Sequence, residues 1–197
     1  MAAFVIADEV EIIDAALMDA YRPGASASLK PHAGRIVVGT DTAEVLEGNW
    51  RPGRVIVAEF PAMASLKRWY QSPEYGELIA LRQRAARTNL IAVEGMDQGA
   101  TMSAFVVADV LSVGDSAAMD EYHRGTPPSI EAHGGRFVVR GGSFEVLEGD
   151  WTPGRVVVVE FPDMTALKAW YGSDEYRRLA AIRQSASSSN LIALPGL

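Results

Sequence analysis

The 197-residue chain contains no cysteine, which excludes disulfide bonds, thiolate metal sites and a cysteine nucleophile. This absence fits a reducing compartment, and we expect a cytoplasmic protein. Long apolar runs are absent as well: the strongest, at residues 156–159, is far shorter than the roughly 20 residues that a membrane helix needs. Residues 1–8 show no secretory signal. The sequence therefore predicts a soluble protein without a membrane partner.

The chain also lacks any concentration of basic residues. Its formal net charge is -7 and its pI is about 5.0, and the arginines are scattered among acidic residues. This distribution opposes binding to a phosphate backbone. A phosphate loop, a dinucleotide-binding fingerprint and a Ser-His-Asp order are missing too. We expect neither a nucleic-acid partner nor nucleotide chemistry.

What the sequence does contain is an internal repeat, because an offset of 101 residues aligns its two halves without a gap. The clearest matches are Glu44–Trp50 with Glu145–Trp151, Pro52–Arg54 with Pro153–Arg155, Glu59–Pro61 with Glu160–Pro162, and Asn89–Ala92 with Asn190–Ala193. A period of this length is that of a domain rather than of a solenoid. We predict a first repeat at residues 1–95, a small, polar and flexible linker at 96–103, and a second repeat at 104–197.

Apolar periodicity within each copy predicts the order βαββαβ. In the first copy we expect strands at 4–8, 34–39, 43–47, 54–60 and 89–93, and helices at 14–29, at 63–70 and from Ser72 to about Thr88. The strands at 34–39 and 43–47 should form a hairpin or a bent pair. In the second copy Asp115 should cap the first helix, and Pro127-Pro128 should break or bend its end.

This order is the ferredoxin-like pattern of the α+β class, with the helices on one face of the sheet. We expect the two repeats to cover each other's open sheet face within one chain. The sequence leaves further homo-oligomerisation open.

The second copy carries a set of short motifs: His133–Gly142, Glu145–Trp151, Glu160–Pro162, Trp170-Tyr171, Ser173–Tyr176 and Arg183. As a set they resemble the bacterial family catalogued as domain of unknown function 1330, and the resemblance covers nearly all of each copy. It implies the dimeric α+β barrel fold, here with both halves on one chain. It also implies kinship with cofactor-independent monooxygenases, polyketide cyclases, isomerases and haem-dependent enzymes, which share a fold and differ in reaction.

The first copy departs from this pattern. Gly39-Thr40-Asp41 stands in place of Arg140-Gly141-Gly142, and Ala33 stands in place of Gly134. The second copy is therefore the better candidate for family-like chemistry.

Arginines and histidines near the glycine turn are the first candidate site residues. Strict alternation places Arg136 and Arg140 on one face of a strand, where two guanidiniums could clamp a carboxylate or an enolate. The alternative is that they pair with nearby glutamates. His133 precedes this strand, where a general acid or base could be held, although a loop histidine is more often solvated. The first copy offers the matching His32 and Arg35. One histidine at this turn in each copy predicts no metal site.

A second set of candidates lies on the helices. Arg183 follows Tyr176 by seven residues, as Arg82 follows Tyr75, so each arginine lies on the same side of its helix as the tyrosine. Each arginine could bind a substrate carboxylate or form a structural ion pair between helix and sheet. Two further aromatic residues are predicted either to line a pocket or to pack in the core: Trp151 and Tyr171.

These features predict a small-molecule-binding protein, and more specifically a cofactor-independent enzyme of isomerase, cyclase or monooxygenase type. Its substrate would be a small organic or polyketide-like metabolite. In this hypothesis His133 or a tyrosine such as Tyr176 transfers protons, while Arg140 and Arg183 stabilise charge. We expect no cofactor. The alternatives are a non-catalytic ligand-binding module, whose pocket would be mostly apolar, and a structural module, whose interior would be filled.

Overall fold

The computed structural model describes residues 1–96 and 99–197. The elements of the first repeat are β1 (Ala3–Ile12), α1 (Ala15–Leu29), a 3₁₀ turn (Lys30–His32), β2 (Arg35–Thr40), β3 (Glu44–Glu47), β4 (Arg54–Phe60), α2 (Met63–Tyr70), α3 (Pro73–Ala85) and β5 (Ala86–Glu94). Those of the second are β6 (Ala104–Val113), α4 (Ser116–Glu131), β7 (Arg136–Arg140), β8 (Phe144–Glu148), β9 (Arg155–Phe161), α5 (Met164–Gly172), α6 (Asp174–Ala186) and β10 (Ser187–Pro195).

Helices begin where the sequence supplies a capping side chain. The Asp14 carboxylate accepts a hydrogen bond from the backbone amide of Leu17, and Asp115 accepts from the amides of residues 117 and 118. Ser72 caps α3 in the same way. These caps confirm the predicted starts. The helix α3 ends at residue 85, about three residues earlier than predicted, because residues 86–94 pair with β1 along their whole length.

Two prolines lie inside α4 and do not end it. The helix continues past Pro127 and Pro128 to Glu131, so of the predicted break or bend the break is wrong. On either side of the prolines, the Thr126 hydroxyl donates to the carbonyl of residue 122 at 2.6 Å and the Ser129 hydroxyl donates to the carbonyl of residue 126 at 2.8 Å. These side-chain bonds go to the carbonyls of residues 122 and 126, whereas the prolines remove the amide donors of the carbonyls at residues 123 and 124.

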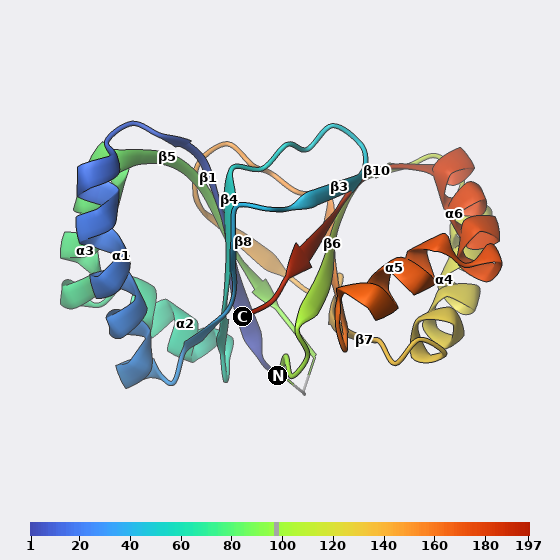
Figure 1. Ribbon diagram of the computed structural model, residues 1–197, viewed down its shortest axis with the longest axis horizontal. Coiled ribbons are helices and arrows are strands. Elements are labelled where there is room, and N and C mark those ends of the chain that lie inside the picture. The colour runs from blue at the N-terminus through green and yellow to red at the C-terminus, as the bar shows by residue number, and fades with distance from the viewer. Residues whose placement is uncertain (97–98) are drawn as a thin grey trace.

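The two repeats exchange strands. One sheet has the order β2-β4-β1-β5-β8 and the other β3-β10-β6-β9-β7, so each holds one strand from the opposite repeat. Figure 1 shows β3 crossing to lie beside β10. The expected hairpin of β2 and β3 is therefore wrong. Its pattern was local, and local periodicity does not specify which sheet edge a strand will join.

The open faces of the two sheets pack against each other, as predicted. The layer between them contains Phe4 and Ile6 from β1 with Phe105 and Val107 from β6, all of them buried. Each such side chain stabilises the fold by roughly 1.5–3 kcal/mol relative to its exposed state. Helices α1–α3 cover the outer face of the first sheet and α4–α6 that of the second (Figure 1). The fold is thus an intramolecular dimeric α+β barrel built from two ferredoxin-like repeats.

The predicted linker is only partly described, since residues 97–98 lie outside the described residues. In the part that is described, the amide of Ala100 donates to Glu59 at 3.0 Å and the amide of Thr101 donates to Glu160 at 2.8 Å. The two matched glutamates therefore anchor this segment, one from each repeat. The boundaries at residues 95 and 104 stay a prediction. No helix among the described residues is long and apolar enough to cross a membrane.

Candidate functional site

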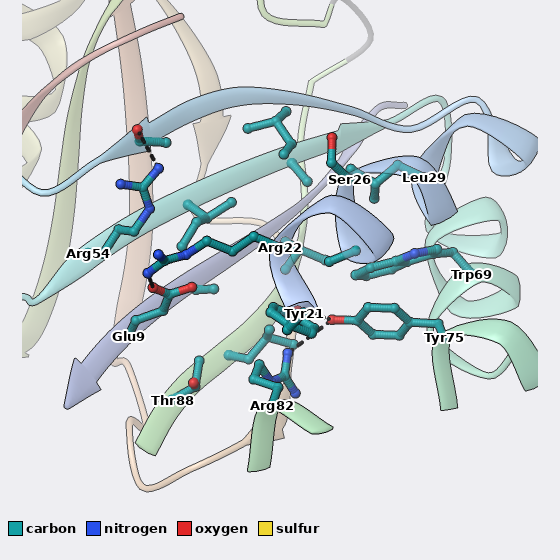
Figure 2. A pocket seen from close by; sticks show the side chains of 18 of the residues that line it. Glu9, Tyr21, Arg22, Ser26, Leu29, Arg54, Trp69, Tyr75, Arg82 and Thr88 are labelled. Atoms are coloured by element: carbon teal, nitrogen blue, oxygen red, sulfur yellow. Dashed lines mark hydrogen bonds and ion pairs between the residues drawn. The ribbon is translucent and has the colours of Figure 1, made fainter. Parts of the chain in front are cut away.

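A cavity of about 270 Å³ lies between the outer face of the first sheet and helices α1–α3. We call it the first-repeat cavity (Figure 2). Its walls are mainly apolar, with Val5, Ala7 and Ile56 from the sheet and Trp69 from α2. Its volume is just below the range of about 300–1,000 Å³ typical of ligand pockets, so it suits a molecule smaller than a drug.

A chain of hydrogen bonds runs along one wall of this cavity. The Tyr21 and Tyr75 hydroxyls lie 3.1 Å apart, and a guanidinium N–H of Arg82 donates to Tyr75 at 3.0 Å (Figure 2). Because the guanidinium can only donate, Tyr75 can direct its own hydrogen to Tyr21, which leaves the Tyr21 hydrogen available to the cavity. Burial, together with the neighbouring Tyr21, raises the pKa of Tyr75 well above its usual range, so Tyr75 stays protonated. This arrangement polarises Tyr21 as a donor.

A row of polar side chains crosses three strands on the cavity side of the sheet. Glu9 on β1 stands opposite Arg54 on β4 and opposite Thr88 on β5. Glu9 is only 5% exposed, and one of its oxygens accepts from Arg22 on α1 at 3.1 Å. The buried Thr88 hydroxyl has no hydrogen-bond partner among the described residues. A buried carboxylate and an unpartnered hydroxyl thus lie in the wall of the same cavity.

The equivalent space in the second repeat is much smaller. This second-repeat cavity measures about 70 Å³. Phe137 and Arg140 occupy the positions of Ile36 and Gly39, and the Arg140 guanidinium lies over the Phe137 ring at 4.8 Å. Glu9 is replaced by Val110. The larger side chains account for the lost volume, and the second cavity has no acid at the position of Glu9.

The predicted helix arginines form ion pairs between the two repeats. Arg82 pairs with Glu148 at 2.8 Å, and Arg183 pairs with Glu47 through two hydrogen bonds of 2.7 and 2.8 Å. The ion-pair alternative is confirmed, although each carboxylate comes from the exchanged strand of the other repeat. Tyr75, Arg82 and Arg183 also contribute to cavity walls.

The prediction that Arg136 and Arg140 share one strand face is wrong. Strand β7 has a bulge, because Phe137 pairs with residue 159 and Val139 with residue 158, which leaves Val138 as the extra residue. The bulge breaks the alternation. Arg140 therefore joins Phe137 at the second-repeat cavity, while Arg136 pairs with Glu160 at 2.5 Å.

The other candidates from the sequence lie elsewhere. Neither His32 nor His133 lines the first-repeat or the second-repeat cavity, and His133 Nδ1 lies 2.9 Å from the carbonyl of residue 129. Trp151 packs against Trp50 between the two sheets, with ring centroids 4.8 Å apart and the rings tilted by 38°. Tyr171 donates to the Leu46 carbonyl. Arg35 pairs with Glu59 and also donates to the Ala100 carbonyl. Tyr176 is buried beside Trp170.

Sequence reasoning missed four residues of the cavity wall: Glu9, Tyr21, Arg22 and Thr88. A signal was present at the offset of 101 residues, where Glu9 aligns with Val110 and Arg22 with His123. Where one copy has a charged residue and the other has an apolar one, the charge is not required by the fold that both copies share. Such a position is typical of a residue with a role in only one copy.

The described residues do not fit haem. The wall of the first-repeat cavity contains no histidine, cysteine or methionine, and the hydroxyls of its two tyrosines bind each other. His123 lines the second-repeat cavity, but about 70 Å³ is too small for a porphyrin. Within the described part of the chain, no three His, Cys, Asp or Glu side chains form a group that could hold a metal ion.

Solved structures with the same fold include a monooxygenase-like protein from Lactobacillus acidophilus NCFM. It is 11% identical, the match covers 98% of this chain and 92% of the other, and the TM-score is 0.58. An anthrone oxidase-like protein is 10% identical, with coverage of 100% and 91% and a TM-score of 0.53. A mutant chlorite dismutase from Candidatus Nitrospira defluvii is 7% identical, with coverage of 98% and 90% and a TM-score of 0.50. At these identities the likeness shows the fold alone.

A comparison with curated proteins finds no match. A family model, described as Domain of unknown function (DUF1330), matches the chain twice, at residues 2–96 and at residues 103–197. The chain therefore belongs to the DUF1330 family, as a tandem pair of its domains.

Proposed function

We propose that the first repeat is a cofactor-independent enzyme that moves a proton on a small organic carbonyl compound. The observation that carries the proposal is that the first-repeat cavity combines an apolar interior with a buried carboxylate, Glu9, and a polarised donor, Tyr21. Isomerisation and cyclisation of such compounds begin with removal of a proton next to a carbonyl group. They require a base for the proton and a donor for the resulting enolate oxygen.

In the proposed reaction the Glu9 carboxylate takes the proton from carbon, and the electron pair moves onto the carbonyl oxygen. The Tyr21 hydroxyl donates a hydrogen bond to that oxygen, supported by Tyr75 and Arg82 behind it. Where the substrate has a carbon–carbon double bond conjugated with the enolate, return of the proton from Glu9 to the far carbon of that dienolate completes an isomerisation. The same enolate is the electron-rich species that oxygenation without a cofactor requires, so the monooxygenase-like class shares this first step.

The proposal moves the working site from the second repeat to the first. His133 lines neither cavity, and the second-repeat cavity is too small for more than a few atoms. The second repeat also carries Val110 where the base would be. The duplicated copy therefore retains the fold without the proposed base.

The test measures proton transfer directly with simple ketones, cyclohexanone and acetophenone, dissolved in deuterium oxide. Proton NMR follows replacement of the hydrogens beside the carbonyl by deuterium, and saturation-transfer NMR follows binding. We expect the protein to accelerate exchange, and Glu9→Gln to slow it by about 10²–10⁴-fold, the usual contribution of a general base. Glu11→Gln is the matched control, because Glu11 is on the same strand and pairs with the exposed Arg87.

Each outcome separates the candidate functions. Binding without exchange would favour the non-catalytic ligand-binding module and overturn the enzyme. Exchange that survives Glu9→Gln would reject Glu9 as the base. The double variant Ile36→Phe, Gly39→Arg brings the second repeat's residues into the first cavity and should abolish binding. A Cβ at Gly39 meets its nearest atom at 3.5 Å, so the backbone tolerates the change. If the native protein bound neither ketone, the structural module would be the candidate function that remains.

A further inference from the structure

We propose that the second-repeat cavity is a separate binding site for a small oxyanion, built from Arg140, Arg155 and His123. This inference concerns the other repeat and does not depend on the first-repeat chemistry. All three side chains line the cavity of about 70 Å³. Since one water occupies about 30 Å³ of liquid, this volume equals roughly two waters. Covalently bonded atoms lie closer together than separate waters do, so the cavity suits a compact ion.

The first argument is the change of charge between matched positions. In the first repeat Arg54 faces Glu9 across the strand pair, and in the second repeat Arg155 faces Val110 in the same register. The acidic neighbour of this arginine is therefore gone. At the same time Arg140 takes the place of Gly39 and adds its guanidinium to those of Arg155 and Arg183 in the cavity lining.

The second argument is that both arginines, although exposed, have a contact that orients the guanidinium and involves no carboxylate. Arg140 lies over the Phe137 ring at 4.8 Å, and Arg155 donates to the Arg140 carbonyl at 3.5 Å. Gly141, with φ of 70°, turns the chain so closely against Arg155 that a Cβ there would lie 2.2 Å from its Nε. Among the described residues, neither arginine forms an ion pair. Held guanidiniums with unused donors are what oxyanion recognition requires.

The third argument is the environment of His123, which takes the place of Arg22. Burial of the ring lowers the pKa of His123, and the positive charges of Arg155 and Arg140 lower it further. The negative charge of Asp120 raises this pKa, but only in part offsets the lowering. At His123 the charges of Arg155 and Arg140 therefore outweigh that of Asp120, although the protein's overall charge is -7. An anion bound there would relieve the repulsion between these groups.

The test titrates the protein separately with acetate and with inorganic phosphate, and follows the His123 ring protons by NMR. We expect saturable shifts and a rise in the pKa of His123 when the anion binds. Arg140→Gly, which installs the first repeat's residue, should weaken binding at least ten-fold. Arg124→Gln is the control, because the exposed Arg124 is adjacent to His123, lies outside the cavity lining and changes the net charge by one unit as well.

The two anions identify the ligand class. Preference for acetate indicates a carboxylate site, and preference for phosphate indicates a phosphate site. Equal weakening by Arg140→Gly and Arg124→Gln would show that only overall charge matters and would overturn the proposal. Shifts that do not saturate for either anion would overturn it as well.

Discussion

Removing the Glu47 carboxylate should destabilise the whole barrel, because it leaves a buried cation without its partner. Arg183 is 2% exposed and reaches Glu47 on the exchanged strand β3 through two hydrogen bonds. Breaking a buried ion pair by truncating one member costs about 3–5 kcal/mol. The Glu47 side chain is 19% exposed, so we expect Glu47→Ala to lower the free energy of unfolding by about 3 kcal/mol, the lower end of this range. With a urea m-value of about 2 kcal/mol/M, the unfolding midpoint falls by about 1.5 M.

The assay is urea unfolding followed by tryptophan fluorescence, and strand β3 supplies its own control. Glu44 pairs with Lys168 at 2.6 Å, but both side chains are about half exposed. Such a pair contributes about 0–1 kcal/mol, so Glu44→Ala should shift the midpoint by less than about 0.5 M. Equal shifts for the two variants would refute the reasoning that burial of Arg183, rather than the presence of an ion pair, sets the cost.

Two further predictions concern the same junction between the repeats. Burial raises the pKa of Glu47, but hydrogen bonds from Arg183 and Gln184 outweigh burial and lower the pKa from its ordinary 4.5. The contribution of the Glu47 carboxylate to stability is therefore complete above pH 4.5 and is lost as the pH falls through the folded-state pKa. Between pH 4.5 and 2.5 the free energy of unfolding should therefore fall more steeply for the native protein than for Glu47→Gln, and parallel urea curves would contradict this. Asn190 accepts hydrogen bonds from the backbone amides of residues 49 and 50, so Asn190→Ala should cost about 1–3 kcal/mol by the same assay, and Asn190→Asp, which keeps the acceptor, should cost less.

Much of the fold follows from local patterns. The offset of 101 residues established the repeat, and capping by Asp115 and Ser72 placed two helix starts correctly. These signals are local because a cap and its amides lie within three residues of each other. The strand exchange had no such signal, since the partner of Glu47 is 136 residues away in the chain.

The candidate site was harder to predict for a related reason. Alternation failed at Val138, because a bulge inserts one residue and turns the rest of the strand over. Glu9 drew no attention in the sequence because it follows the predicted strand at 4–8, where a glutamate is ordinarily solvated, whereas β1 continues to Ile12. Its importance depends on burial between β4, β5 and α1, which only the assembled sheet and helix provide.

The two repeats differ in a pattern that separates structural from functional residues. The inter-repeat ion pairs are present in both directions, from Arg82 to Glu148 and from Arg183 to Glu47, as the pseudo-symmetry of the barrel requires. The cavity walls are not symmetric. In a homodimer any substitution appears in both sites at once, whereas in a tandem chain each cavity changes alone. Val110 in place of Glu9 and Arg140 in place of Gly39, both in the second repeat, are thus changes that duplication permits, and they favour two cavities of different chemistry on one scaffold.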